Sequence, residues 1–194
     1  MNKRVLHLIA LLLLSTTAAF SQAVSMTAAT GGLSGAAQIS GTNNIAILGV
    51  QLTKAAGGGN TVTTITVAMT PTPVGKFTNA RLYESTDATF SGVGTETQIA
   101  SGTISATDIS FTGAPLTNFD GATAAADDEY FFIVVDVAPA ATGSTTPSLA
   151  STGVVLSTGT TTGSTITGST YTLTPPQTTI ANLSTGLAAS PLQA

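Results

Sequence analysis

Acidic side chains form the densest chemical group of this 194-residue chain. Asp120, Asp127, Asp128 and Glu129 lie close together. Carboxylate oxygens are the ligands that calcium prefers, and the ion takes about six to eight oxygens. The group lacks the Asp-x-Asp-x-Asp-Gly spacing of a calcium loop, so solvated loop acids are the default interpretation. Calcium is the one cofactor candidate, and no other cofactor is expected.

Asp136 is the one acid embedded in an apolar run. Glycoside hydrolysis requires two carboxyl groups roughly 5 to 9.5 Å apart, one of them in an apolar pocket. We favour a structural role, in which Asp136 accepts hydrogen bonds from loop backbone at a strand end. Tyr83 and Tyr130 offer rings for stacking on a sugar, but a chain without tryptophan supplies few such platforms. We predict no catalytic residue, with glycan as an additional candidate ligand.

The first residues have the pattern of a secretory signal peptide. Basic residues at positions 3–4 precede an apolar run over 5–14, and 21–23 form a small-x-small cleavage site. A membrane span needs about 20 apolar residues, more than this run supplies. We therefore predict that residues 1–23 are a cleaved leader of a bacterial protein that is secreted or displayed on the cell surface. No membrane span is expected after cleavage.

The remaining composition excludes several classes of function. The leader carries two of the five basic residues, which leaves three against nine acidic ones and a formal charge of 3 − 9 = −6. It also carries the only histidine, and the chain has no cysteine and no tryptophan. Catalytic triads, Cys-His pairs and zinc sites need imidazole or thiolate groups. A nucleic-acid surface needs clustered Lys and Arg, so no nucleic-acid partner is expected.

Residues 129–137 are the predicted centre of the fold. Tyr130, Phe132 and Val134 alternate on one face, and the residues between them are also apolar. A short run that is apolar on both faces is typical of a strand buried on both sides. Tyr130 also fits a tyrosine corner, in which the hydroxyl bonds upstream backbone.

Further alternating segments complete an all-β prediction. Residues 45–53 place Ala46, Leu48 and Val50 on one face, and residues 61–69 align Ile65 with Val67. No segment after the leader has a helical period. About eight or nine short strands separated by turns indicate an antiparallel two-sheet β-sandwich. The predicted core residues are Tyr130, Phe132, Val134, Leu48, Val50, Ile65 and Val67.

Three segments together resemble a known family. Ile-Leu-Gly-Val at 47–50, Ala-Arg-Leu-Tyr-Glu-Ser-Thr at 80–86 and the acidic-to-apolar run at 128–137 are similar to the immunoglobulin-like domain near the N-terminus of bacterial BNR-repeat sialidases. Related modules occur in large secreted proteins of the Bacteroidetes type. The resemblance covers residues 25–174 and implies a non-catalytic immunoglobulin-like module. The catalytic residues of a sialidase belong to its propeller, so none is carried over.

The predicted division is a sandwich over residues 24–174, a linker over 175–178 and a tail over 179–194. Paired prolines favour an extended, stiff linker. At an offset of 154, Gly32-Leu33 of the sandwich falls on Gly186-Leu187 of the tail. Chance in biased sequence and the start of a second similar module both remain open.

Three functions follow as hypotheses. The first is a spacer or interaction domain of a larger protein, with neighbouring modules as partners. The second is an accessory fragment of a sialidase or another glycoside hydrolase. The third is a self-assembling adhesin or fibre subunit, in which the tail adds a strand to a neighbour's sheet.

Overall fold

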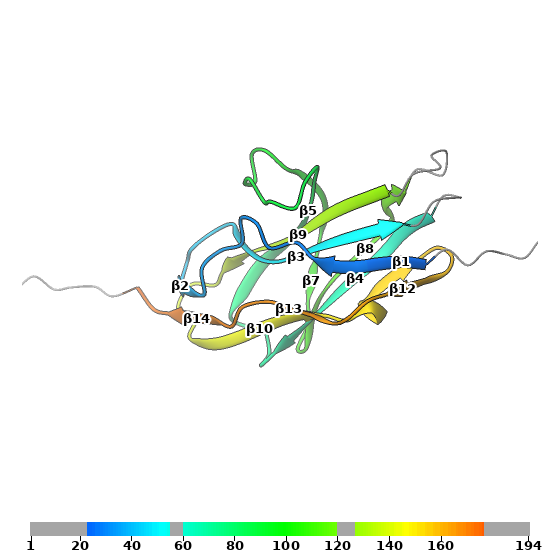
Figure 1. The fold of residues 1–194 in the computed structure, drawn as a ribbon. Coiled ribbons are helices and arrows are strands. Elements are labelled where there is room, and N and C mark those ends of the chain that lie inside the picture. Colours follow the sequence, from blue (N-terminus) through cyan, green and yellow to red (C-terminus); the bar gives the residue numbers. More distant parts are fainter. Residues whose placement is uncertain (1–22, 55–59, 120–126, 177–194) are drawn as a thin grey trace, which may run out of the picture.

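The computed structural model describes residues 23–54, 60–119 and 127–176, which form two packed β-sheets (Figure 1). The strands of the first sheet are β1 (Ala23–Ala28), β3 (Ile45–Lys54), β5 (Phe77–Ser85), β6 (Thr97–Ser101), β9 (Asp127–Val137) and β12 (Thr160–Thr162). The second sheet contains β2 (Ala37–Ile39), β4 (Asn60–Thr70), β7 (Thr103–Ile104), β8 (Asp108–Phe119), β10 (Gly143–Leu149), β11 (Val154–Leu156), β13 (Ile166–Thr167) and β14 (Tyr171–Thr174). In this part of the chain the one helical segment is the 3-10 turn η1 (Ser151–Gly153).

Each sheet has a long strand near its middle. The order in the first sheet is β12-β1-β3-β9-β5-β6, and in the second β2-β14-β10-β4-β8-β7. β11 also pairs with β4, and β13 pairs with β10. The chain changes sheets several times, for example between β6 and β7, so both sheets are assembled from segments far apart in sequence.

The central position of β9 is confirmed. β9 pairs with β3 on one side and β5 on the other. Phe131 and Ile133 are fully buried in the main core between the sheets, whereas Phe132 and Val134 are fully buried in a second cluster. The apolar pattern on both faces therefore has a structural cause, because each face of β9 packs against other parts of the protein.

The second cluster lies on the outer face of the first sheet. Two loops cover it, one after β1 and one between β5 and β6. They meet where Gly31 donates to the Ala88 carbonyl at 3.1 Å and accepts from the Phe90 amide at 3.0 Å. The cluster contains Ala29, Ala46, Tyr83, Phe90, Phe132 and Val134.

A β-bulge interrupts the alternation of β3. Ala46 pairs with Val134 and Leu48 pairs with Ile133, so Ile47 is an extra residue on its strand. Both Ile47 and Leu48 consequently enter the main core, while Ala46 belongs to the second cluster. The prediction that Ala46 and Leu48 share a face is wrong.

Two other expectations need correction. The sheets are mixed rather than antiparallel, because β1 pairs with β12 and β2 pairs with β14 in parallel. The described residues form 14 strands rather than eight or nine, and β8 extends through residues 115–119. Several of the additional strands have only two or three residues, too few to give an alternation that can be recognised in sequence.

The first and last described strands lie at opposite ends of the sandwich (Figure 1). β1 begins at one end, beside β12. β14 finishes at the other end, where Thr174 pairs with Ile39 and its carbonyl accepts a hydrogen bond from the Ser40 amide at 2.8 Å. We call this second end, around Ile39, Thr174 and the β4–β5 turn, the outgoing end.

Candidate functional site

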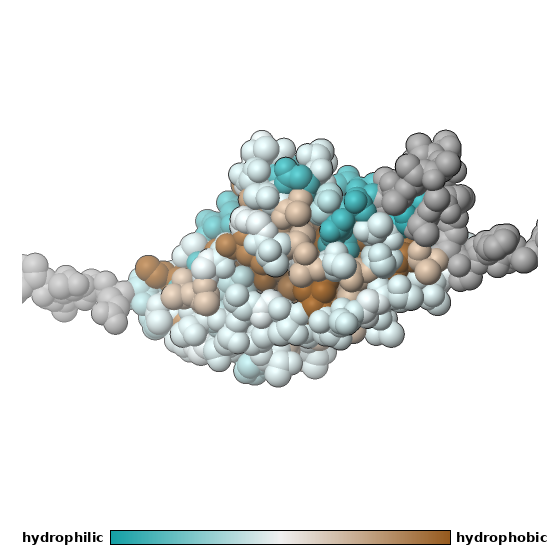
Figure 2. Space-filling model, viewed as in Figure 1, coloured by the Kyte–Doolittle hydropathy of each residue, from teal (hydrophilic) through white to brown (hydrophobic). Residues whose placement is uncertain are grey.

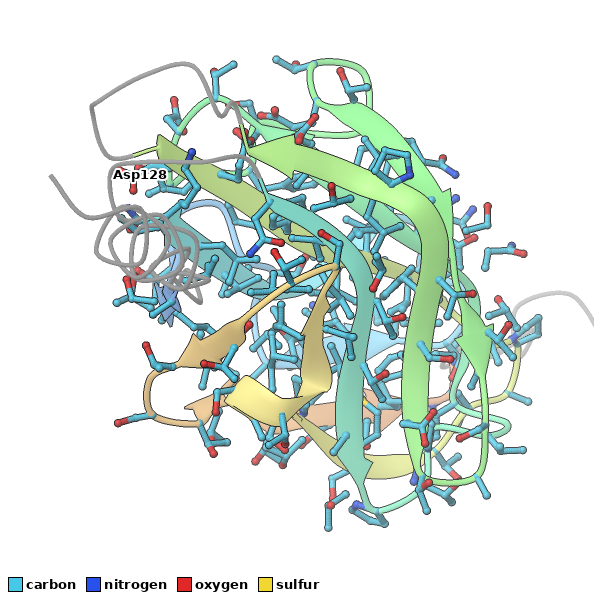
Figure 3. The ribbon with its side chains drawn as sticks, turned by 90° about the vertical axis from the view of Figure 1, so that its right-hand side faces the viewer. Asp128 is labelled. Carbon is cyan, nitrogen blue, oxygen red and sulfur yellow. The ribbon has the colours of Figure 1, made fainter. Side chains whose placement is uncertain are left out.

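Two residues of the predicted acidic group, Asp128 and Glu129, line a polar hollow at the start of β9. The hollow has a volume of about 560 Å³. Asp128 lies at the periphery of the molecule rather than in its packed centre (Figure 3). β5, β6 and the loop between them supply the opposite side of the hollow. Its lining residues are Glu84, Ser85, Thr86, Asp87, Ser91, Thr95, Glu96, Thr97, Asp128 and Glu129.

This hollow offers negative charge and hydrogen-bonding oxygens. All of its lining residues are Ser, Thr, Asp or Glu. A carboxyl group that serves as a general acid needs an apolar environment that favours its protonated form. The hollow has no apolar wall to provide that environment, so its composition suits contact with cations or sugar hydroxyls better than glycoside hydrolysis.

The structure describes only part of the predicted calcium-binding group. Asp128 and Glu129 line the hollow. Asp120 lies outside the described residues, and the side chain of Asp127 is not described. Within the described ranges, no three or more Asp, Glu, His or Cys residues are arranged to hold a metal ion. Calcium binding therefore stays a prediction.

Asp136 holds together the loop before β3 and a bulge within β5. Its Oδ1 accepts a hydrogen bond from the Asn44 backbone amide at 2.8 Å, and its Oδ2 accepts one from the Asn79 side chain at 2.8 Å. Both asparagines have positive φ, 60° and 48°, a conformation that asparagine tolerates better than most residues. The prediction that Asp136 bonds loop backbone at a strand end is confirmed.

Asp136 also forms an ion pair with Arg81 across β5 and β9. Burial alone would raise the pKa of Asp136, but the hydrogen bonds from Asn44, Asn79 and Arg81 and the Arg81 charge together hold its pKa below the ordinary value. The carboxylate is therefore a structural acceptor whose ionised form is favoured in the folded state.

We expect Asp136→Asn to change the pH dependence of stability. A carboxyl with a lowered pKa in the folded state stabilises the protein above its unfolded value of about 3.9, and this contribution is lost as pH falls through the folded pKa. The variant should lose about 2 kcal/mol of unfolding free energy at neutral pH, the size of a lost charge-assisted hydrogen bond. Urea unfolding between neutral pH and pH 3 measures both effects.

The matched control for this experiment is Asp128→Asn, because Asp128 is exposed. Its unfolding free energy at neutral pH should stay within about 0.5 kcal/mol of the wild-type value, as is normal for an exposed substitution. An Asp136→Asn variant with an unchanged profile would contradict the assigned role of the carboxylate.

Tyr171 is the tyrosine whose hydroxyl lies against backbone carbonyls. It is fully buried in β14, and its hydroxyl is 3.2 Å from the Ala46 carbonyl oxygen and 3.3 Å from that of Ile47, at the bulge of β3. Burial raises the pKa of Tyr171 to about 12. The hydroxyl thus stays protonated and can donate a hydrogen bond to a backbone carbonyl at the bulge, where the ladder hydrogen bonds between strands are interrupted. Tyr130, the predicted tyrosine corner, instead lies half-buried against the second cluster.

The remaining predicted core residues are all buried. Leu48, Val50, Ile65 and Val67 lie in the main core. Sequence reasoning missed Lys54, which is fully buried at the end of β3 although lysine is normally exposed. No helix within residues 23–54, 60–119 and 127–176 has the length and apolar character of a membrane span.

Comparison with known proteins gives no family. No family model matches the chain, and no curated protein matches it. A solved structure titled "AvmM Catalyzes Macrocyclization in Alchivemycin A Biosynthesis" is similar over 83% of this chain and 93% of its own, with a TM-score of 0.37 and 6% identity. A likeness at this level carries no argument about fold family or activity.

Proposed function

We propose that this chain provides a non-catalytic, immunoglobulin-like module that acts as a spacer or interaction domain of a larger secreted or cell-surface protein. The observation that carries the proposal is the placement of β1 and β14 at opposite ends of the sandwich (Figure 1). A module that receives the chain at one end and releases it at the other separates its neighbours by its own length. Neighbouring modules are the expected partners.

The edges of both sheets support a module that stays monomeric. The terminal strands β12, β2 and β7 have three, three and two residues. β6 is longer, but a register shift opposite Leu82 and Tyr83 leaves Ile99 as an extra residue. Short and bulged edges hinder pairing with another sheet. They favour the spacer over a fibre subunit that accepts a donated strand.

A comparison of the tail with the segment that includes Gly31 and Gly32 also favours the spacer over the fibre subunit. Gly32 has φ +70°, and a Cβ there would lie 2.0 Å from the Phe90 carbonyl oxygen, so the glycine that Gly186 reproduces is required. The tail departs from the segment at a neighbouring position. Thr185 falls on Gly31, where a Cβ would lie 2.5 Å from Oγ1 of Thr89. Thr185 therefore argues against placing the tail at the β1 position of another copy.

The spacer function predicts a monomer with a fixed end-to-end distance. Because the chain lacks cysteine, fluorophores can be placed on single introduced cysteines near the start of β1 and after β14. We expect one narrow distance distribution and a monomeric mass in sedimentation at every protein concentration tested. Concentration-dependent assembly would instead support the fibre subunit, and hydrolysis of a glycoside by the purified chain would refute the non-catalytic assignment.

A further inference from the structure

The outgoing end exposes large apolar side chains. Ile39 is 58% exposed and Val74, in the β4–β5 turn, is 56% exposed, the highest values among the large apolar residues described. The loop after Ile39 and the β4–β5 turn both contact the end of β9. The Val137 amide donates to the Thr42 carbonyl at 2.8 Å, and the adjacent Ala138 amide donates to the Lys76 carbonyl at 2.9 Å, so the two segments belong to the same end. Apolar surface is visible where β2 and β14 lie (Figure 2).

The chain continues from the position beside Ile39. Thr174 pairs in register with Ile39 in the parallel β2–β14 pair, and Pro175-Pro176 follow directly. Neighbouring strands are about 4.8 Å apart. Residue 177 is therefore only three residues along the chain from Thr174, the partner of the exposed isoleucine.

The composition of residues 177–194 suits an apolar surface. The segment contains no charged residue, and its large apolar side chains are Ile180, Leu183, Leu187 and Leu192. Ile180 is six residues after Thr174, so a chain of about 3.5 Å per residue keeps it within roughly 20 Å. A short tether of this kind gives an effective concentration in the millimolar range. Docking then needs only a weak intrinsic affinity.

We propose that residues 177–194 dock on the outgoing end of their own sandwich, with Ile39 at the centre of the contact. β2 is the terminal strand of its sheet and pairs only with β14 among the described strands. The exposed side of this strand and the Ile39 side chain together form the docking surface. The contact would fix the direction in which the chain leaves the module, and it does not require the spacer function.

Cysteine accessibility tests the proposal directly. Ile39→Cys introduces the sole thiol of the chain, and its exposed position allows the fold to be retained. We expect a maleimide to label Ile39→Cys at least about fivefold more slowly in the full chain than in a chain ending at Pro176. Val155→Cys is the matched control, because Val155 is 47% exposed on β11 and should label equally in both chains.

A second variant identifies the docking residues. Ile180→Ser combined with Leu183→Ser, in the full chain, should restore the fast labelling of Ile39→Cys. Equal Ile39→Cys rates in the full and shortened chains would overturn the proposal. Protection that increases with protein concentration would also overturn it, because the occupant would then be a second copy.

Discussion

Phe131→Ala is expected to lower the free energy of unfolding by about 3 to 5 kcal/mol. Phe131 is fully buried in the main core, and its strand is flanked by Val50 of β3 and Glu84 of β5. Removing the ring deletes apolar contacts and leaves a cavity that the neighbouring strands can only partly fill. Domains are typically stable by about 5 to 15 kcal/mol, so the variant should be partly unfolded at moderate temperature. Urea denaturation followed by circular dichroism measures the loss.

Val155→Ala is the control for this substitution. Val155 is 47% exposed on β11, and a surface change of this kind normally alters stability by less than about 0.5 kcal/mol. A Phe131→Ala variant as stable as Val155→Ala would mean that β9 is not the centre of the core.

Gly49→Ala is expected to destabilise the protein by about 3 kcal/mol, at the upper end of ordinary overpacking. A Cβ at Gly49 would lie 2.2 Å from the Ala29 carbonyl oxygen and 2.6 Å from Cε1 of Phe132. The Ala29 amide also donates to the Gly49 carbonyl at 3.1 Å, so the two backbones are held together. A methyl group must separate them or displace the Phe132 ring. Thermal and urea unfolding both report the loss.

Gly94→Ala is the matched control, because no atom lies within 4 Å of a Cβ at that position. Reducing the freedom of the unfolded chain at such a site should leave stability unchanged or raise it by up to about 1 kcal/mol. If Gly49→Ala also left the stability unchanged, the assigned close contact between the loop after β1 and β3 would be contradicted.

These two sites show how the sandwich would serve as a spacer. β9 packs against apolar clusters on both faces, and Gly49 lets the loop after β1 close over the outer one. A module with both faces of its central strand buried resists local opening, since its strands must separate from two clusters together. That property suits a domain whose role is to keep neighbours at a fixed distance.

The sequence by itself determined the composition of the core and which chemical groups the chain contains. The apolar character of both faces of β9 was recognisable from sequence, because alternate residues of a strand point to opposite faces of the sheet. The lack of histidine and cysteine after residue 23 is likewise a property of composition. The role of Asp136 was also predictable, because an acid at the end of an apolar strand needs nearby hydrogen-bond donors.

Only the tertiary structure decided the partners of these segments. The bulge at Ile47, the contact of the Tyr171 hydroxyl with it and the parallel pairing of β2 with β14 join residues far apart in sequence. None of these three features has a local sequence signature. A bulge can be recognised only against its partner strand, and the role of a buried hydroxyl depends on which carbonyl it contacts. The direction in which the chain enters and leaves the sandwich was decided in the same way, by which strands pair across the two sheets.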